Sequence, residues 1–317
     1  MEILLQRGRP ARVEAPGIRD LAEARTWLCA ARTEIRAALD EHGALVLRGL
    51  PVRSVREFVA VRDVILPPPG EVRRGPSFGD DICFREERDP ARPIRMHNEN
   101  SYALTFPGTL LFGCLVAPEH GGATQVADCR AVLRNLPEGL AEKFRTFGWR
   151  LTSSHERRRS EFSECRIRSR ADVERYCAEN LISCAWESGR LRTGRLRSAI
   201  IRHPHTGEEL WFNHVTAANA RSLEARLRAG PGGGEPLCDT AFGNGDVITD
   251  EDVAALNKAY DAATFRERWR QGDLLLVDNL LTAHGREPSR TAGRIMVAGG
   301  AQVGLDECDP TVAPAAV

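Results

Sequence analysis

The stretch that decides the fold is Met96–Pro118, MHNENSYALTFPGTLLFGCLVAP. Its second half is a short apolar run bounded by a Pro-Gly pair and a proline, which is typical of a fully buried strand. The first half places His97 and Glu99 two residues apart. In a strand, residues i and i+2 project from the same face, so the two side chains would point to one place. The stretch therefore predicts a buried strand beside a pair of possible metal ligands.

Further short apolar runs lie on both sides of this stretch. They are ALVLRGL from Ala44, ATQVAD from Ala123, LLLVDN from Leu274 and RIMVAGGAQV from Arg294. Glycine, proline and aspartate residues separate them, as expected of turns between strands. The hairpin sequence HPHTGEELWFN, from His203, predicts another strand pair. The pattern indicates many short strands.

Helical spacing of apolar residues occurs at the start of the chain and between the strands. Residues 18–42 predict one or two helices that end at Gly43, and residues 51–65 predict another. Thr249 and Asp252 predict a capping box for a helix, and TFRERW, residues 264–269, predicts one more. Strands that do not alternate with helices favour a mainly β fold with α insertions (α+β), arranged as a double-sheet β roll.

An arginine-rich region, residues 151–198, shows few strand signals. Two stretches rich in proline and glycine, residues 67–76 and 229–236, predict loops. Arginines 157–159, 166, 168 and 170 resemble a nucleic-acid patch, but glutamates are interspersed and no aromatic pattern suits base stacking. A solvated protein face is the better interpretation, and we expect no nucleic-acid partner.

Length and composition favour one enzyme-sized domain over residues 1–317, of which 42% are apolar. The 44 basic and 44 acidic residues give zero formal charge, so no global field attracts nucleic acid or a membrane surface. The nine cysteines are scattered without a C-x-x-C pair, which disfavours a disulfide framework and suits a reducing cytoplasm. No signal peptide or transmembrane run is recognisable, so we expect a cytoplasmic protein.

A third ligand for a metal at His97 and Glu99 must come from elsewhere in the chain. Of the other seven histidines, His284 is distinctive because it follows the buried strand LLLVDN and a short turn. Two imidazoles and one carboxylate form the facial triad of non-haem Fe(II), which leaves coordination positions open. The turn around His203 and His205 is more typical of a structural corner than of a second metal site.

Arg294 lies ten residues beyond His284, immediately before the strand IMVAG. A buried arginine is costly unless it is paired, and a bound carboxylate could pair with it bidentately. The alternatives are a structural salt bridge from Arg294 to Asp273 or Asp278, and a cosubstrate role for Arg286 or Arg290 in its place.

Four motifs together resemble the Fe(II)/2-oxoglutarate dioxygenases of the taurine dioxygenase-like (TauD/TfdA) superfamily. They are MHNENSY, PEHGGATQVAD, HPHTGEELWFN and GDLLLVDNLLTAHGR with its trailing Arg294, and the resemblance extends from about Gly43 to about Val303. The H-x-E metal motif is most similar to the syringomycin-pathway aspartyl hydroxylase-like branch.

The resemblance implies a fold, a metal site and a reaction. The fold is a double-stranded β-helix (jelly roll) with N-terminal helices and a helical lid inserted at about residues 151–215. His97, Glu99 and His284 are implied as catalytic iron ligands, and Thr124 and Arg294 as partners of 2-oxoglutarate. The cofactors implied are Fe(II), 2-oxoglutarate and O2. The reaction couples decarboxylation of 2-oxoglutarate to succinate and CO2 with hydroxylation of a C–H bond.

Two departures from the taurine dioxygenase pattern narrow the class of substrate to be expected. Glu99 replaces the aspartate of much of the superfamily, and Ala298 stands where taurine-type enzymes have a sulfonate-binding arginine. We therefore expect a small-molecule substrate that is an amino acid or amino-acid-derived natural-product intermediate, free or attached to a carrier protein. Candidate substrate contacts are Asn100, Ser101, Arg192 and Asn213. Desaturation or cyclisation, and a ligand-binding jelly roll without turnover, are the alternative interpretations.

Overall fold

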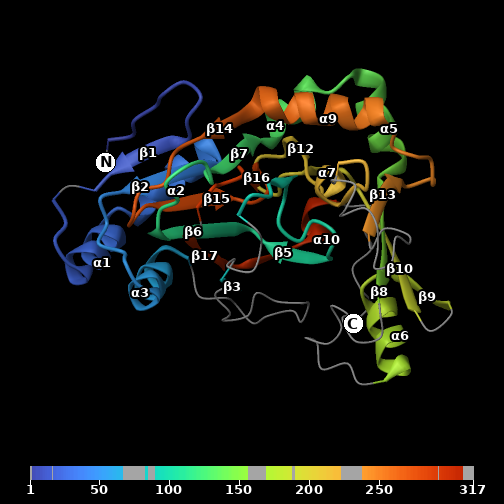
Figure 1. Cartoon of the computed structure of the whole chain (residues 1–317), viewed down its shortest axis with the longest axis horizontal. Helices are drawn as coiled ribbons and strands as arrows, with labels where there is room; N and C mark the ends of the chain where they lie inside the picture. The colour runs from blue at the N-terminus through green and yellow to red at the C-terminus, as the bar shows by residue number, and fades with distance from the viewer. Residues whose placement is uncertain are drawn as a thin grey trace. The chain divides into compact units, whose positions relative to one another are not determined.

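The computed structural model describes residues 2–15, 17–66, 83–84, 90–155, 169–187, 190–222, 238–291 and 293–309 (Figure 1). The chain divides into two compact units. Unit 1 comprises Met1–Glu99, Thr105–Cys129 and Ala263–Val303. Unit 2 comprises Asn100–Leu104, Arg130–Ala262 and Gly304–Val317. The loops predicted at residues 67–76 and 229–236 lie outside the described residues.

The N-terminal helices form as the spacing of apolar residues predicts. Residues 18–42 give two helices, α1 (Leu21–Ala30) and α2 (Arg32–His42), and α3 spans Val55–Ile65. Asp20 and Ser54 cap α1 and α3 through their side chains. Gly43 ends α2 with φ of 70°, a left-handed conformation that glycine adopts at low cost.

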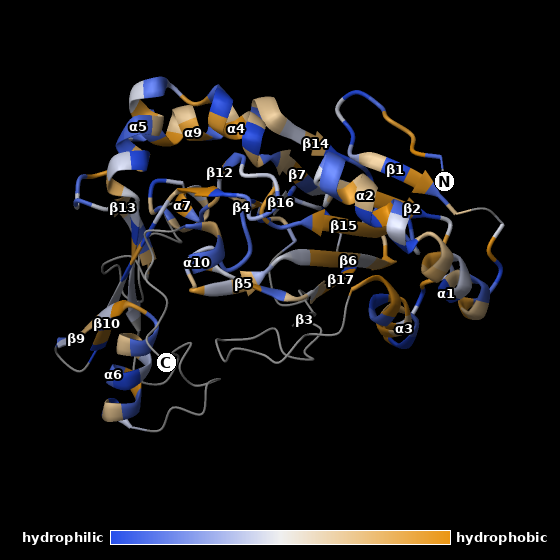
Figure 2. Ribbon diagram, turned by 180° about the vertical axis from the view of Figure 1, so that it is seen from behind, coloured by the Kyte–Doolittle hydropathy of each residue, from blue (hydrophilic) through white to orange (hydrophobic). Residues whose placement is uncertain are grey.

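The larger sheet of unit 1 has the order β1-β2-β15-β6-β17-β3. Its strands are β1 (Ala11–Glu14), β2 (Ala44–Arg48), β15 (Leu274–Asp278), β6 (Thr109–Val116), β17 (Arg294–Gly299) and β3 (Cys83–Phe84). Only the β1–β2 pair is parallel. All residues of β2 and β15 are buried, which explains their continuous apolar sequence, visible for β15 in Figure 2. The predicted strands of this sheet are confirmed.

The smaller sheet of unit 1 has the order β14-β7-β16-β4. Its strands are β14 (Thr264–Arg266), β7 (Thr124–Asp128), β16 (Thr282–Arg286) and β4 (Ile94–His97). Val126 of β7 packs in one buried cluster with Leu110, Phe112 and Val277 of the larger sheet. The two sheets therefore share an apolar core. A short pair, β5 (Thr105–Pro107) with β18 (Gln302–Gly304), completes the strands of this part of the chain.

Unit 2 contains a four-stranded sheet of order β13-β8-β10-β9 and a hairpin, β11 (Ile200–Arg202) with β12 (Glu209–Trp211). The sheet strands are β8 (Trp149–His155), β9 (Ile182–Glu187), β10 (Arg190–Arg197) and β13 (Cys238–Phe242). Its helices are α5 (Glu138–Phe147), α6 (Arg170–Glu179), α7 (Val215–Ala218), α9 (Asp250–Ala263, at the unit boundary) and α10 (Leu305–Cys308). Helix α4 (Cys129–Asn135) begins at the other boundary.

The sequence predicted a helical lid at about residues 151–215 and few strands over residues 151–198, and both predictions are wrong for the described residues, whereas the strand pair predicted around His203 is confirmed as β11 and β12. That segment contains β9, β10, β11, β12 and most of β8, with only α6 and the start of α7 as helix. The reason is visible in β10, RLRTGRLR, whose buried positions include Arg195 and Arg197 while Leu196 is exposed. The alternation of burial is therefore not an alternation of hydrophobicity.

The prediction of a helix over TFRERW is also wrong. Thr264–Arg266 form β14, the edge strand that pairs with Val126 and its neighbours in β7. The capping box predicted at the start of the preceding helix is confirmed, since Thr249 N–H donates to Asp252 and Asp252 N–H donates to the Thr249 hydroxyl.

Candidate metal centre

Three buried side chains converge where β4, the edge strand of the smaller sheet, pairs with β16. His97 ends β4 and His284 lies in β16, where the two residues are direct antiparallel partners with ring centroids 4.4 Å apart. Glu99 Oε2 lies 3.8 Å from His97 Nε2 and 3.3 Å from His284 Nε2. The three ligand atoms are all within 4.8 Å of one another. Two imidazoles and one carboxylate at this spacing fit a divalent metal with open positions.

Glu99 does not lie in the same strand as His97, contrary to what its spacing predicted. Strand β4 ends at His97, so Glu99 lies in the turn that follows and not on the same strand face. Asn98 is fully buried, and its amide donates to the Asn279 carbonyl at 2.8 Å. The next residue, Asn100, has a φ of 56°. Such left-handed backbone is uncommon outside glycine and often occurs at functional sites.

Asn279 holds the Glu99 backbone on both sides. Its Oδ1 accepts the Glu99 N–H at 2.8 Å, and its Nδ2 donates to the Glu99 carbonyl at 3.1 Å and to the Pro107 carbonyl at 2.8 Å. Asn279 is fully buried. Sequence spacing did not reveal this residue, although it ends the motif LLLVDN. A buried asparagine after an apolar strand is a usable signal, because its amide needs polar partners.

His97 is oriented by a backbone contact. Its Nδ1 lies 2.8 Å from the Arg95 carbonyl, which favours a proton on Nδ1 and leaves Nε2 as the metal-binding atom. The other histidine pair behaves as predicted. His203 Nδ1 accepts the backbone N–H groups of His205 and Thr206, so it stabilises the hairpin turn.

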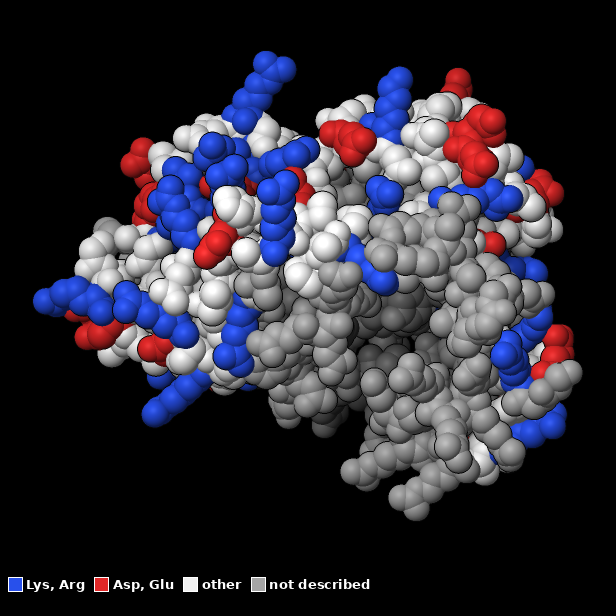
Figure 3. Space-filling view, viewed as in Figure 1, with Lys and Arg blue, Asp and Glu red and all other residues white. Residues whose placement is uncertain are grey.

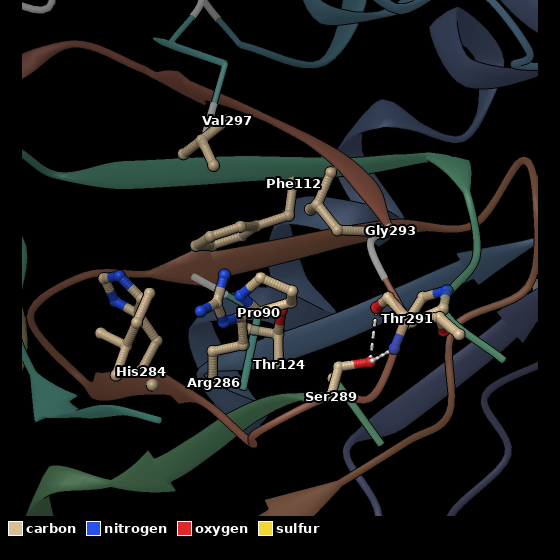
Figure 4. Close-up of a pocket in the computed structure, with 14 residues that line it drawn as sticks. Pro90, Phe112, Thr124, His284, Arg286, Ser289, Thr291, Gly293 and Val297 are labelled. Carbon is tan, nitrogen blue, oxygen red and sulfur yellow. Dashed lines mark hydrogen bonds between the residues drawn. The ribbon is translucent and has the colours of Figure 1, made fainter. Parts of the chain in front are cut away.

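A cavity of about 100 Å³ opens beside His284, between the two sheets of unit 1 (Figure 4). Thr124, His284 and Arg286 provide its polar lining, together with Ser289 and Thr291. Arg286 and Thr124 are cross-strand partners, and Figure 4 draws both beside the cavity. Apolar side chains form much of the remaining wall, among them Ile94, Phe112, Ile295 and Val297. A cavity of this kind can hold a small anionic molecule next to the metal ligands.

Of the two residues predicted to hold 2-oxoglutarate, Thr124 is among the lining residues of the cavity and Arg294 is not. Thr124 lines the cavity, and its Oγ1 accepts the indole N–H of Trp269 at 3.2 Å. Along β17 it is Ile295 and Val297 that line the cavity, while Arg294 is not among its lining residues. Arg286, weighed as an alternative, does line it, and its Nη2 donates to the Arg92 carbonyl at 2.9 Å. The alternative partner Asp273 is bound bidentately by Arg48.

The four predicted substrate contacts all lie in unit 2. Asn100 accepts a hydrogen bond from the Tyr102 hydroxyl at 3.1 Å, and Ser101 Oγ lies 3.5 Å from His214 Nδ1. Arg192 is exposed on β10 and pairs with Glu187 at 2.8 Å. Asn213 is fully buried, and its amide contacts the Ala199 carbonyl and the Val215 N–H.

Comparison with known proteins assigns the chain to a family. The family model "Taurine catabolism dioxygenase TauD, TfdA family" matches residues 7–299, and the chain belongs to this family. The Dapdiamide synthesis protein DdaC of Enterobacter agglomerans is 31% identical over 273 residues, covering 82% of each chain. The clavaminate synthase-like protein At3g21360 of Arabidopsis thaliana is 23% identical over 275 residues, covering 81% of each.

Solved structures show the same fold. PvcB of Pseudomonas aeruginosa matches with a TM-score of 0.54 and 18% identity, covering 93% of this chain and 86% of PvcB. PvcB is described as an Fe, alpha-ketoglutarate dependent oxygenase from an isonitrile synthetic pathway. AAD-2, in complex with Mn(II) and N-oxalylglycine, matches with a TM-score of 0.52 and 16% identity over 95% of this chain and 97% of AAD-2.

The protein is therefore a non-haem Fe(II)/2-oxoglutarate-dependent dioxygenase, with O2 as its second cosubstrate. None of the helices in the described ranges combines the length and apolar character that crossing a membrane requires.

Proposed function

We propose that the protein hydroxylates an unactivated C–H bond of an amino acid or an amino-acid-derived natural-product intermediate, with decarboxylation of 2-oxoglutarate to succinate and CO2. The observation that carries the proposal is the buried convergence of His97, Glu99 and His284 beside a cavity with a basic side chain. The similarity to a protein of dapdiamide synthesis supports a natural-product substrate.

Each residue of the centre has a defined part in this proposal. His97, Glu99 and His284 would hold Fe(II), which supplies the activation of O2 when bound. The Arg95 carbonyl orients His97, and Asn279 fixes the backbone on both sides of Glu99. The apolar wall formed by Phe112, Ile295 and their neighbours limits the access of water to the cavity.

We propose that Thr124 and one arginine hold the far carboxylate of 2-oxoglutarate. Arg294 is the arginine that the resemblance implies, and Arg286 is the one that lines the cavity beside Thr124. Affinity for 2-oxoglutarate in Arg286→Ala and Arg294→Ala, measured separately, distinguishes the two. Loss of the bidentate partner should weaken binding about tenfold or more, because charge-assisted hydrogen bonds contribute roughly 1.5–3 kcal/mol.

Substrate recognition is proposed for the segment of about residues 151–215 together with the turn after Glu99. Asn100, Ser101, Arg192 and Asn213 are the candidates, and the left-handed Asn100 follows a metal ligand directly. The two sheets of unit 1, with their common apolar core, are consistent with the two halves of a jelly roll in one oxygenase domain. The substrate can be free or carrier-bound in this proposal.

An anaerobic titration tests the metal and cosubstrate assignments. Fe(II) and 2-oxoglutarate together should give a weak visible charge-transfer band, which His284→Ala should abolish and His205→Ala should retain. Folded wild-type protein without the band would contradict the assignment.

Mass spectrometry against a panel of amino acids and aminoacylated carrier proteins tests the reaction. A product that gains one oxygen atom supports hydroxylation. A product that loses two hydrogen atoms would instead establish desaturation or cyclisation.

A further inference from the structure

A second concave site lies in unit 1, separate from the metal cavity. It is a groove of about 660 Å³, here called the arginine groove. Its lining residues are Arg7, Gly8, Arg9, Ala123, Arg266, Glu267, Arg268, Trp269, Arg270 and Glu287. Five of these are arginines and two are glutamates, so positive charges exceed negative charges by three. Figure 3 shows Lys and Arg side chains gathered over β1 and β14.

The acidic residues of the groove are already paired. Glu267 bonds Arg9 at 3.1 Å and also lies 3.5 Å from the buried Arg48. Glu287 bonds Arg266 at 3.0 Å. By contrast, the exposed side chains of three lining residues make no ion pair within the described residues: Arg7, Arg268 and Arg270. Three uncompensated guanidinium groups in one concavity focus positive potential there.

A buried ion pair fixes the backbone of two of these arginines, Arg268 and Arg270. Arg48 and Asp273 form a buried bidentate pair with distances of 2.9 and 2.7 Å. Arg48 Nη2 also donates to the Arg268 carbonyl at 3.1 Å, and Asp273 Oδ2 accepts the Arg270 N–H at 2.8 Å. The segment is therefore held on both sides of Trp269. Groups held in place before a ligand arrives lose less entropy when they bind it.

Trp269 gives the groove an aromatic wall. Its indole is half-buried, and its N–H is bound to Thr124 Oγ1, which lines the metal cavity on the inner face of β7. Ala123 and Glu287, the sequence neighbours of Thr124 and Arg286, line the groove. The metal cavity and the groove are therefore lined by successive residues at the point where β7 begins and β16 ends.

We propose that the arginine groove is a binding site for a diphosphate-bearing anion, held by Arg7, Arg268 and Arg270 against the Trp269 ring. Guanidinium groups bind phosphate oxygens bidentately, and three of them match the several charges of a diphosphate. Inorganic diphosphate and a nucleoside diphosphate share this chemistry. The proposal does not rest on the reaction of the metal centre.

The test is calorimetric titration of the metal-free full-length protein with inorganic diphosphate and, separately, with ADP, at constant ionic strength. Both should bind, with quenching or a shift of Trp269 emission that Trp269→Phe removes. Equal affinities would show that the diphosphate suffices, and tighter ADP binding would show stacking of the base on Trp269.

Two variants locate the site. Arg268→Ala with Arg270→Ala should weaken diphosphate binding about tenfold or more, while Arg25→Ala, which removes an exposed arginine from α1, should not change it. His284→Ala should also retain binding, which separates the groove from the metal cavity. Thermal unfolding of each variant confirms that it is folded.

Three results would overturn the proposal. They are absence of binding in the wild-type protein, unchanged affinity in the folded double variant, and loss of binding in His284→Ala. Binding of a hexaglutamate peptide but not of diphosphate would make this surface a protein contact instead, and would overturn it as well.

Discussion

Replacement of Asn279 by alanine should separate the stability of the fold from the affinity of the metal site. The Asn279 side chain makes three hydrogen bonds, to the N–H and carbonyl of Glu99 and to the carbonyl of Pro107, all in a fully buried position. At roughly 1 kcal/mol net for each bond, Asn279→Ala should lower the free energy of unfolding by about 3 kcal/mol. Because Glu99 loses its support, metal affinity should also fall, by roughly 10- to 100-fold.

Asn219 provides a matched control. It is equally buried, and its amide donates to the Thr240 carbonyl and hydroxyl and accepts the Arg221 N–H, all within unit 2. Asn219→Ala should therefore lose similar stability but retain metal affinity. Urea denaturation measures the first quantity, and the electron paramagnetic resonance signal of free Mn(II) during titration measures the second. If both variants bound Mn(II) as the wild-type protein does, the positioning role of Asn279 would be refuted.

Three further predictions concern neighbouring groups. Thr124→Val removes the hydroxyl proposed to hold the far carboxylate of 2-oxoglutarate, so affinity for 2-oxoglutarate should fall about fivefold, for roughly 1 kcal/mol. The same change removes the acceptor of the Trp269 N–H, so Trp269 emission should shift, and unchanged emission would contradict the contact. Asp273→Ala leaves Arg48 buried without its carboxylate partner, so the free energy of unfolding measured by chemical denaturation should fall by about 3–5 kcal/mol. Asp40→Ala, at an exposed position, should change it little. Burial raises the pKa of the Cys129 thiol to about 12. From about pH 9 the unfolded chain therefore releases this proton while the native protein retains it. The free energy of unfolding should fall as the pH rises from about 9 to about 12. Between pH 8 and pH 10 the loss should be about 1.4 kcal/mol smaller in Cys129→Ala than in the wild-type protein, and equal losses would refute the assignment.

The parts of the molecule that the sequence predicts well are those where hydrophobicity and burial coincide. Strands β2, β6 and β15 are apolar because both of their faces are covered, and the ligands His97, Glu99 and His284 converge as expected. Glu99 was assigned to the strand because its spacing from His97 fits one, but that spacing fits a turn equally well. The turn depends on Asn279, whose partners lie far away in sequence.

Strand β10 shows why the arginine-rich region could not be predicted. Arg197 is buried, and its guanidinium donates to the backbone carbonyls of Tyr102, Leu181, Leu196 and Asn180. Burial lowers the pKa of Arg197 to about 10, which shows that the buried environment disfavours the charged guanidinium. The hydrogen bonds to the four carbonyls offset this cost. A buried arginine with backbone partners has the same sequence signal as an exposed one. The arginine groove was missed for a related reason, since Arg7 and Arg268 meet only in the folded chain.

The direct pairing of His97 with His284 across β4 and β16 has a consequence for the biosynthesis of the protein. His284 is added to the nascent chain 187 residues after His97. At roughly 5–20 residues per second, that interval is about 10–40 s of translation. During this time the first two ligands exist without the third, and β4 has no partner in its sheet. Iron can therefore enter a complete site only after β16 has been made, so metal loading follows synthesis of this strand and stabilises the folded chain thereafter.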